Sequence, residues 1–266
     1  MSLTIENNIL MKNGKPFFYL ADTCWSAFTI IVDNDWDYYL DYRKSQGFNT
    51  LQINILPQWD ASATDLCYEP FEVIDGKYNY KKLNLSYFEH ADKMCARAKE
   101  KGFELALVIM WCNFVPDTWA SQFYSKGLMP IDCIDNYINI IHETFTKYEP
   151  LYIISGDTDF NTEQCIEYYV KCAKQIKELA PNCLYTTHIK GRYTYIPDNL
   201  YSYLDLCFYQ SGHNAQNLGM PYLLAEEMAD KYKGKPVINS EPCYEDMGYS
   251  RQMYGRWSKE DIIRAA

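Results

Sequence analysis

Phe103-Glu-Leu-Ala-Leu-Val-Ile-Met-Trp111 is a nearly continuous apolar segment, and Leu151-Tyr-Ile-Ile154 is a second one. Between them, Pro130 to Lys147 has the apolar spacing of an amphipathic helix, with a proline near its start. Strand, helix and strand in this order predict a βαβ unit, in which two parallel strands are joined by a helix. Near-continuous apolar strands are typical of parallel sheets, because both faces of such a sheet are covered.

The same alternation extends along the whole chain in both directions. We predict strands over residues 17–21, 48–56, 103–111, 151–154, 183–188, 203–209 and 236–240. We predict helices over residues 35–46, 83–101, 130–147, 163–179 and 220–232, and the start of a further helix at 258–266. No change in composition and no Gly/Ser-rich linker divides these units, so residues 1–266 are expected to form a single domain.

Two architectures contain repeated βα units: the doubly wound sheet and the closed barrel. The first predicted strand is not followed by Gly-x-Gly-x-x-Gly, and no Walker-type phosphate loop is present. Polar residues instead follow the carboxyl end of almost every strand, and in a barrel these ends share one rim. We therefore predict an α/β fold of the (β/α)8 TIM-barrel type. Because only seven strands are found, the barrel is expected to be truncated before its eighth strand; the alternative is that two strands are counted as one or that one is missed.

Composition and charge restrict the partners of the chain. The formal net charge of −10 argues against binding to nucleic acid or to an anionic membrane surface, which both require a basic face. The sequence has no stretch of about 18 apolar residues, so no membrane span is predicted. The ten cysteines are scattered singly, as is typical of free thiols in a reducing compartment. With no visible signal peptide, a cytoplasmic location is expected; a secreted protein whose leader has been removed is the alternative.

The segment Pro236-Val-Ile-Asn-Ser-Glu-Pro-Cys-Tyr-Glu245 carries the first candidate catalytic residue, Glu241. Glu241 follows an apolar strand and precedes Pro242, which restricts its backbone to extended geometry. A carboxylate held stiffly at a strand end can attack an anomeric carbon. The alternative is a glutamate that caps a helix or forms a salt bridge in a loop.

Asp157 is the second candidate, at the end of the predicted strand Leu151-Tyr-Ile-Ile-Ser-Gly-Asp157. A carboxylic acid here can protonate a departing glycosidic oxygen if burial or a neighbouring carboxylate raises its pKa. Asp159 and Asn161 are better placed to cap the following helix, which leaves Asp157 for chemistry. The roles of Asp157 and Asp159 can nevertheless be exchanged.

Two strand-end carboxylates surrounded by polar and aromatic side chains indicate a glycosidase. About 5–5.5 Å between the carboxyl groups implies retention of configuration, and about 6.5–9.5 Å implies inversion. Other residues at the predicted rim are expected to bind substrate through ring faces or hydrogen bonds. These are Asp22, Trp25, Gln52, Trp111, Asn113, Asp159, His188, Tyr209, His213 and Tyr244.

Four motifs together resemble the apiosidase-like glycoside hydrolases, which are barrel enzymes related to the wider endoglucanase-type superfamily. They are Asn13-Gly-Lys-Pro-Phe-Phe-Tyr-Leu-Ala-Asp-Thr-Cys-Trp25, Asp41-Tyr-Arg-Lys-Ser-Gln-Gly-Phe-Asn-Thr50, Ser155-Gly-Asp157 and Ser240-Glu-Pro-Cys-Tyr-Glu245. The resemblance implies an aspartate acid/base at Asp157 and a glutamate nucleophile at Glu241. It also implies a final strand after the seventh helix, often followed by a β-sandwich. The chain departs from the family in having Ser155-Gly where two glycines are common, and it lacks the Asn-Glu pair of the superfamily at strand four.

The resulting hypothesis is a retaining glycoside hydrolase that cleaves an O-glycosidic bond in a plant-type or other complex carbohydrate. Its substrate is an oligosaccharide or polysaccharide, and neither a cofactor nor a metal is expected. A non-catalytic carbohydrate-binding barrel is the first alternative. A metal-dependent hydrolase is the second, disfavoured by the absence of His-x-His and His-Glu-x-x-His motifs.

Overall fold

Parallel strands and the helices that follow them make up most of the computed structural model, which describes residues 3–59, 66–213, 219–249 and 255–265. Five parallel strands form one sheet in the order β10-β9-β8-β5-β4, and β11 and β12 form a parallel pair. The strands are β4 (Ala21–Thr23), β5 (Thr50–Asn54), β8 (Glu104–Trp111), β9 (Leu151–Gly156), β10 (Leu184–Thr186), β11 (Cys207–Tyr209) and β12 (Val237–Asn239). Six of the seven predicted strands coincide with strands of this series, and the first is displaced.

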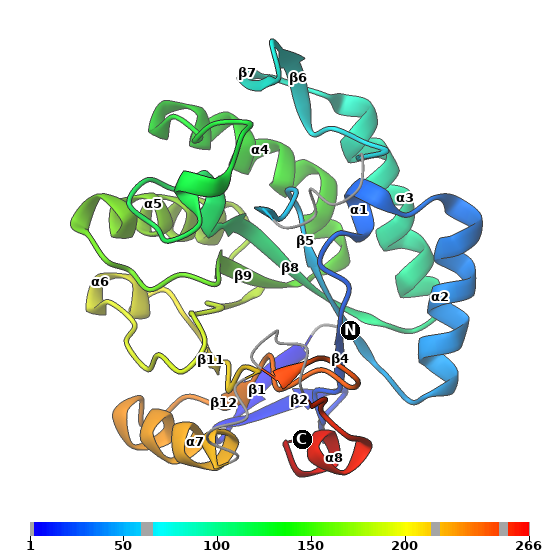
Figure 1. The fold of residues 1–266 in the computed structure, drawn as a ribbon, viewed down its shortest axis with the longest axis vertical. Helices are drawn as coiled ribbons and strands as arrows, with labels where there is room; N and C mark the ends of the chain where they lie inside the picture. Colours follow the sequence, from blue (N-terminus) through cyan, green and yellow to red (C-terminus); the bar gives the residue numbers. More distant parts are fainter. Residues whose placement is uncertain (1–2, 60–65, 214–218, 250–254, 266) are drawn as a thin grey trace.

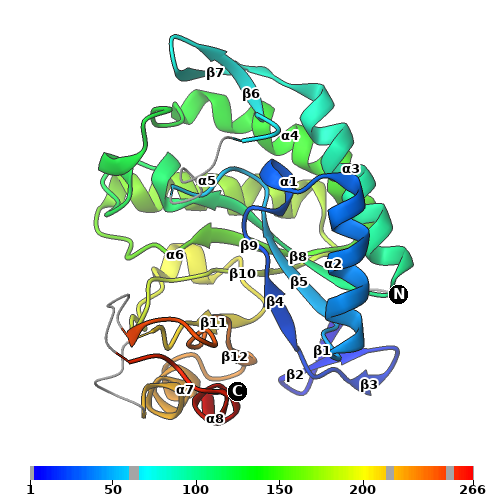
Figure 2. The same cartoon turned by 45° about the vertical axis from the view of Figure 1, so that its right-hand side comes forward.

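A helix follows each strand of this series and lies outside the strands (Figures 1 and 2). The helices are α1 (Ala27–Ile30), α2 (Asp33–Ser45), α3 (Leu85–Glu100), α4 (Ile134–Phe145), α5 (Glu163–Leu179), α6 (Asp198–Tyr201), α7 (Met220–Lys231) and α8 (Lys259–Ala265). Short 3₁₀ turns are η2 (Cys112–Phe114), η3 (Ser121–Phe123), η4 (Ile131–Cys133) and η5 (Thr146–Tyr148). This order is the (β/α)-barrel arrangement, and it confirms the predicted fold class.

The ring of strands is open between β12 and β4. The gap between β10 and β11 is bridged by backbone hydrogen bonds from Asp205 and Leu206 to the Tyr185 carbonyl. Among the described residues, no strand joins β12 to β4. Side chains span this opening instead: the Gln52 amide donates to the Ser240 carbonyl at 2.8 Å, and the Thr23 hydroxyl donates to Tyr244 at 2.9 Å.

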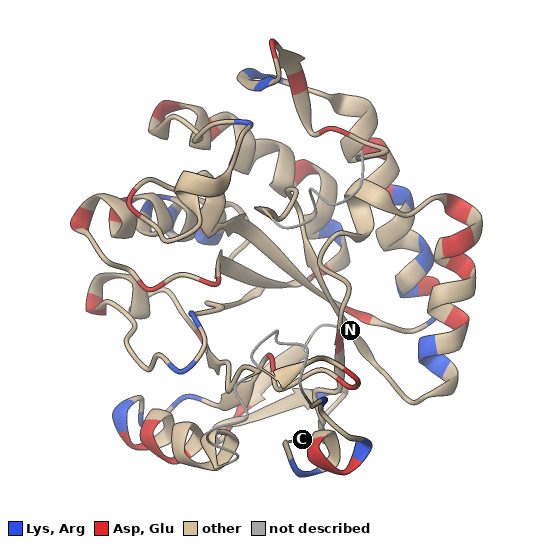
Figure 3. Cartoon of the chain, in the orientation of Figure 1, with Lys and Arg blue, Asp and Glu red and all other residues tan. Residues whose placement is uncertain are grey.

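The core lies between the central strands and the helices. Every residue of β5, β8 and β9 is buried. Tyr87 of α3 and Tyr137 of α4 are fully buried, and their hydroxyls donate to strand carbonyls at Ile55 and Ile109. Buried phenols need such partners, so these bonds fix the helices against the strands. Charged side chains lie mostly on the outer helices and loops (Figure 3).

Two hairpins were not predicted from the sequence. One consists of β1 (Leu3–Glu6), β2 (Ile9–Lys12) and β3 (Lys15–Pro16), and the other of β6 (Phe71–Ile74) and β7 (Lys77–Leu83). The first covers the amino ends of the strands, because Lys12 forms an ion pair at 2.6 Å with the buried Glu104 that starts β8. The second protrudes beyond α3 and α4 (Figure 1).

The predicted first strand at 17–21 is wrong in its position. The backbone N–H of Phe17 donates to Leu10 of the hairpin, and the Phe18 side chain is 71% exposed. The barrel strand β4 begins only at Ala21, because the preceding apolar residues complete the hairpin and the turn out of it. Within β4, Thr23 contacts Tyr244 across the opening, and Asp22 points to the opposite face.

Gly156 at the end of β9 has no room for a side chain. A β-carbon there would lie 2.0 Å from the Trp111 ring. We expect Gly156→Ala to lower the free energy of unfolding by about 1–3 kcal/mol through overpacking. Urea unfolding of Gly156→Ala, alone and combined with Trp111→Leu, tests this contact. In the Trp111→Leu background, the smaller side chain should remove most of the loss in free energy of unfolding that Gly156→Ala causes. Equal losses with and without Trp111→Leu would contradict the contact between these two positions.

Candidate active site

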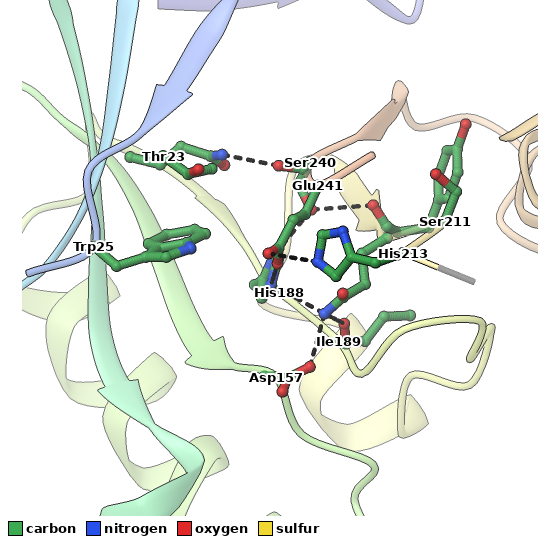
Figure 4. A network of polar contacts seen from close by, with 12 residues as sticks. Thr23, Trp25, Asp157, His188, Ile189, Ser211, His213, Ser240 and Glu241 are labelled. Atoms are coloured by element: carbon green, nitrogen blue, oxygen red, sulfur yellow. Dashed lines mark hydrogen bonds and ion pairs between the residues drawn. The ribbon is translucent and has the colours of Figure 1, made fainter. Parts of the chain in front are cut away.

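Glu241 lies directly after β12, and its side chain is held by donors from three loops (Figure 4). The residue is 8% exposed. Its Oε2 atom is 2.9 Å from Nε2 of His188, which follows β10, and its Oε1 atom is 3.5 Å from Nε2 of His213, which follows β11. The Tyr244 hydroxyl donates to Oε1 at 2.6 Å. Glu241, His188, His213 and Tyr244 are all residues that the sequence selected.

The charge of Glu241 is stabilised by these neighbours. Burial by itself raises the pKa of the Glu241 carboxyl, but hydrogen bonds and positive charge from His188 and His213 outweigh it. The net result is a pKa below the ordinary value for glutamate. Glu241 is therefore a buried carboxylate that stays ionised at neutral pH.

His188 is oriented from both ring nitrogens. Its Nδ1 atom is 2.9 Å from the Ser240 hydroxyl, which in turn donates to the Tyr209 carbonyl at 3.0 Å. With the hydroxyl proton engaged there, the Ser240 oxygen is left to accept from Nδ1 of His188. These contacts fix the plane of the imidazole ring and place Nε2 against Oε2 of Glu241.

Tyr244 connects Glu241 to the other side of the opening in the barrel. Its hydroxyl accepts hydrogen bonds from Thr23 at 2.9 Å and from the Trp25 indole at 3.3 Å. The Trp25 ring packs at centroid distances of 5.2 Å on Trp111 and 5.3 Å on His188. Trp25 and Trp111 therefore pack against each other and against His188, beside the carboxylate.

Asp157 follows β9, and both its backbone and its side chain are hydrogen-bonded. It adopts a left-handed conformation with φ of 50°, which costs energy for a non-glycine residue. Its carbonyl accepts from the Trp119 indole at 2.7 Å. Its Oδ1 atom accepts at 2.7 Å from the side-chain amide of Gln210, which follows β11. The side chain is half-buried, so it can be reached by a substrate.

Gln210 is the link between the two carboxylates, and it was not among the predicted site residues. Its amide nitrogen donates to Asp157 and to the Ile189 carbonyl, and it lies 3.2 Å from Nε2 of His188. The path from Oε2 of Glu241 to Oδ1 of Asp157 thus has steps of 2.9, 3.2 and 2.7 Å. These two oxygens are therefore at most about 9 Å apart, below the upper limit of about 9.5 Å for the carboxylate separation in glycosidases.

Asp159 has a different environment from Asp157. Its Oδ2 atom forms an ion pair with Lys190 at 3.0 Å, and the residue is 7% exposed. The expectation that Asp159 or Asn161 caps the following helix is wrong, because the Thr162 hydroxyl accepts from the Cys165 N–H at the start of α5. Asp159 instead ties the loop after β9 to the loop after β10.

The other predicted residues divide into two groups. Trp25, Trp111, His188, His213 and Tyr244 gather around Glu241, and Gln52 touches this group through the Ser240 carbonyl. Asp22, Asn113 and Tyr209 do not. Asp22 faces α2, where it pairs with Arg43 at 2.6 Å and accepts from Tyr39. Asn113 is fully buried within η2, and the Tyr209 hydroxyl donates to Pro221 at the start of α7.

The described part of the chain has neither a metal-binding cluster nor a membrane-spanning helix. No group of three or more His, Cys, Asp and Glu side chains in it is arranged to hold a metal ion. None of the described helices is long and apolar enough to cross a membrane.

Comparison with known proteins gives one family and a set of similar folds. Residues 5–266 match the family described as apiosidase-like, catalytic domain. No match was found among curated proteins. A crystal structure of a glycoside hydrolase family 5 protein from Bacteroides vulgatus is similar with a TM-score of 0.82 at 24% identity. The similarity covers 100% of this chain and 59% of the Bacteroides vulgatus chain.

Two more solved structures share the fold. A structure named glycoside hydrolase has a TM-score of 0.78 at 23% identity, and covers 100% of this chain and 61% of that one. The endo-1,4-β-D-mannanase from Thermotoga petrophila has a TM-score of 0.61 at 16% identity, and covers 94% of this chain and 84% of that one. The chain spans about three fifths of the length of the first two.

The lowered pKa of Glu241 links its charge to stability. A carboxyl whose pKa is lower in the folded than in the unfolded state, where glutamate titrates near about 4.3, stabilises the fold above that pH and loses this contribution as the pH falls below it. Glu241→Gln has no such contribution to lose. We expect the free energy of unfolding of wild type minus that of Glu241→Gln to decrease between about pH 6 and about pH 3.5.

Urea unfolding at several pH values measures this difference. Glu245→Gln, at an exposed neighbouring position, is the matched control and should show little change with pH. A difference for Glu241→Gln that stays constant or grows on acidification would contradict the buried, ionised carboxylate.

Proposed function

The chain belongs to the family of apiosidase-like catalytic domains, and on that basis we propose that it is a glycoside hydrolase that cleaves O-glycosidic bonds in a complex, plant-type carbohydrate. The observation that carries the proposal is the pair of carboxylates Glu241 and Asp157 at the ends of β12 and β9. Through His188 and Gln210 their oxygens Oε2 and Oδ1 are at most about 9 Å apart, which does not exceed the separation of about 9.5 Å that glycosidases allow. Half-buried Trp25 beside Glu241 supplies an apolar face for a sugar ring, whereas Trp111 is buried and packs against Trp25.

The proposed role of Glu241 is that of nucleophile. Its ionised Oε atoms attack the anomeric carbon, and an ester bond forms to the sugar while the bond to the leaving oxygen breaks. His188, His213 and Tyr244 hold the carboxylate in one orientation, which favours attack by a single oxygen.

Asp157 takes the proposed role of acid and then base. In the first step its carboxyl proton passes to the leaving oxygen, and the carboxylate remains. In the second step this carboxylate accepts a proton from water, whose oxygen attacks the anomeric carbon and releases Glu241. The product keeps its anomeric configuration. Half-burial lets Asp157 reach a substrate oxygen, whereas the ion pair with Lys190 removes Asp159 from this role.

Three substitutions test these roles on a panel of 4-nitrophenyl glycosides and pectic oligosaccharides. We expect Glu241→Gln to lose nearly all activity on every substrate that wild type cleaves. Asp157→Asn should lower kcat by roughly a hundredfold or more on oligosaccharides, and less on 4-nitrophenyl glycosides, whose leaving group needs little protonation. Asp159→Asn is the matched control and should retain activity.

The outcomes separate the competing assignments. Loss of activity in Asp159→Asn but not in Asp157→Asn would assign the acid/base role to Asp159 instead of Asp157. Unchanged turnover in both Glu241→Gln and Asp157→Asn would reject the proposal. Binding of oligosaccharides in calorimetry without any hydrolysis by wild type would indicate a carbohydrate-binding barrel.

Gln210 is proposed to position Asp157 without touching the substrate. Gln210→Met has a similar shape but cannot donate to Oδ1 of Asp157 or to Ile189. We expect kcat to fall by about tenfold, with KM nearly unchanged, because the acid loses its orientation while the sugar contacts remain. Steady-state kinetics on a cleaved 4-nitrophenyl glycoside measures this split. A rise in KM with constant kcat would instead make Gln210 a binding residue.

A further inference from the structure

Trp59, Trp119 and Phe123 form an aromatic cluster that the proposed mechanism does not use. Trp59 and Trp119 meet at nearly right angles, with ring centroids 5.3 Å apart and an interplanar angle of 85°. Phe123 continues the cluster at 6.0 Å from Trp59. The Phe123 side chain is 59% exposed, and both tryptophans are half-buried. Contiguous exposed groups of apolar side chains, unlike single ones, often mark binding sites.

The cluster lies at the carboxyl ends of the strands, on one side of Asp157. Trp59 follows β5, and Trp119 and Phe123 follow β8. In the sheet, β9 lies between β8 and β10. Asp157 at the end of β9 therefore has this cluster on its β8 side, and His188, which contacts Glu241, on its β10 side.

A direct hydrogen bond joins the cluster to the candidate acid. The Trp119 indole donates to the Asp157 carbonyl at 2.7 Å. The turn that carries Trp119 and Phe123 is itself tightly bonded, through Thr118 to the Cys112 carbonyl and through the Phe123 N–H to Ala120. The Trp119 ring is thus held at a fixed place relative to the Asp157 backbone, and Trp59 packs against it, as a preformed binding surface requires.

We propose that Trp59, Trp119 and Phe123 bind the sugar on the leaving-group side of the scissile bond. This inference rests on the proposed function, since it takes Asp157 as the acid and Glu241 as the nucleophile. In such a displacement the leaving oxygen departs beside the acid and away from the nucleophile. A sugar attached to that oxygen extends past Asp157 on the side away from Glu241, where the cluster lies. The ligand is a neutral sugar ring, whose apolar C–H face packs on indole and phenyl faces.

The test compares two leaving groups on the same sugar. A 4-nitrophenyl glycoside carries a ring on the leaving side, and the corresponding glycosyl fluoride carries none. For the glycone that wild type cleaves, we expect Trp59→Ala and Phe123→Ala to lower the ratio of kcat/KM for the 4-nitrophenyl glycoside to kcat/KM for the fluoride by about tenfold. Tyr38→Ala removes another exposed ring, from α2, and should leave the ratio unchanged. A ratio that stays at the wild-type value in both cluster variants overturns the proposal.

A binding measurement keeps the test independent of turnover. In protein with ¹⁵N-labelled tryptophan, pectic and mannan oligosaccharides should shift the indole N–H resonances of Trp59 and Trp119, assigned with Trp59→Phe and Trp119→Phe. Shifts without hydrolysis by wild type would reject the proposed function and retain the sugar site. Hydrolysis by wild type with an unchanged ratio in both cluster variants would retain the proposed function and reject the sugar site. Neither shifts nor hydrolysis would reject both.

Discussion

A buried carboxylate needs compensation, and the candidate site is organised around that need at Glu241. Removing the charge from water costs several kcal/mol unless donors and opposite charge replace the solvent. Two histidines and a tyrosine supply them, and each comes from a loop that follows β10, β11 or β12. The same donors hold the carboxylate in one orientation, so the interactions that make its burial tolerable also prepare it for chemistry.

The partners of Glu241 extend this network around the barrel mouth. Ser240 fixes the ring of His188, Tyr244 reaches Thr23 and Trp25 across the opening between β12 and β4, and Gln210 reaches Asp157. Parallel strands whose carboxyl ends share one rim bring residues far apart in sequence into contact. The aromatic cluster beside Asp157 belongs to the same rim, on the side of Asp157 away from Glu241.

Much of the fold could be predicted from apolar periodicity. The strands and the helix at 163–179 were predicted from their apolar residues, because a run of such residues must be covered by other elements on one or both faces. The hairpins were missed, although Asn13-Gly14 and Asp75-Gly76 are turn pairs with positive φ at both residues. Their strands are short and only partly buried, so hydrophobic pattern alone did not reveal them. The first barrel strand was misplaced for the same reason, since the hairpin takes the apolar residues before it.

The sequence by itself determined the order of βα units and which carboxylates end a strand, because both follow from local pattern: Glu241 before Pro242, and Asp157 and Asp159 after β9. Only the tertiary structure decided which side chains bind these carboxylates. Lys190 neutralises Asp159, Gln210 engages Asp157, and Asp22 turns outward to Arg43, in each case through a residue from another element. A side chain's partners depend on strand register and on which face it occupies, and neighbouring residues of a strand point to opposite faces, as Asp22 and Thr23 of β4 do.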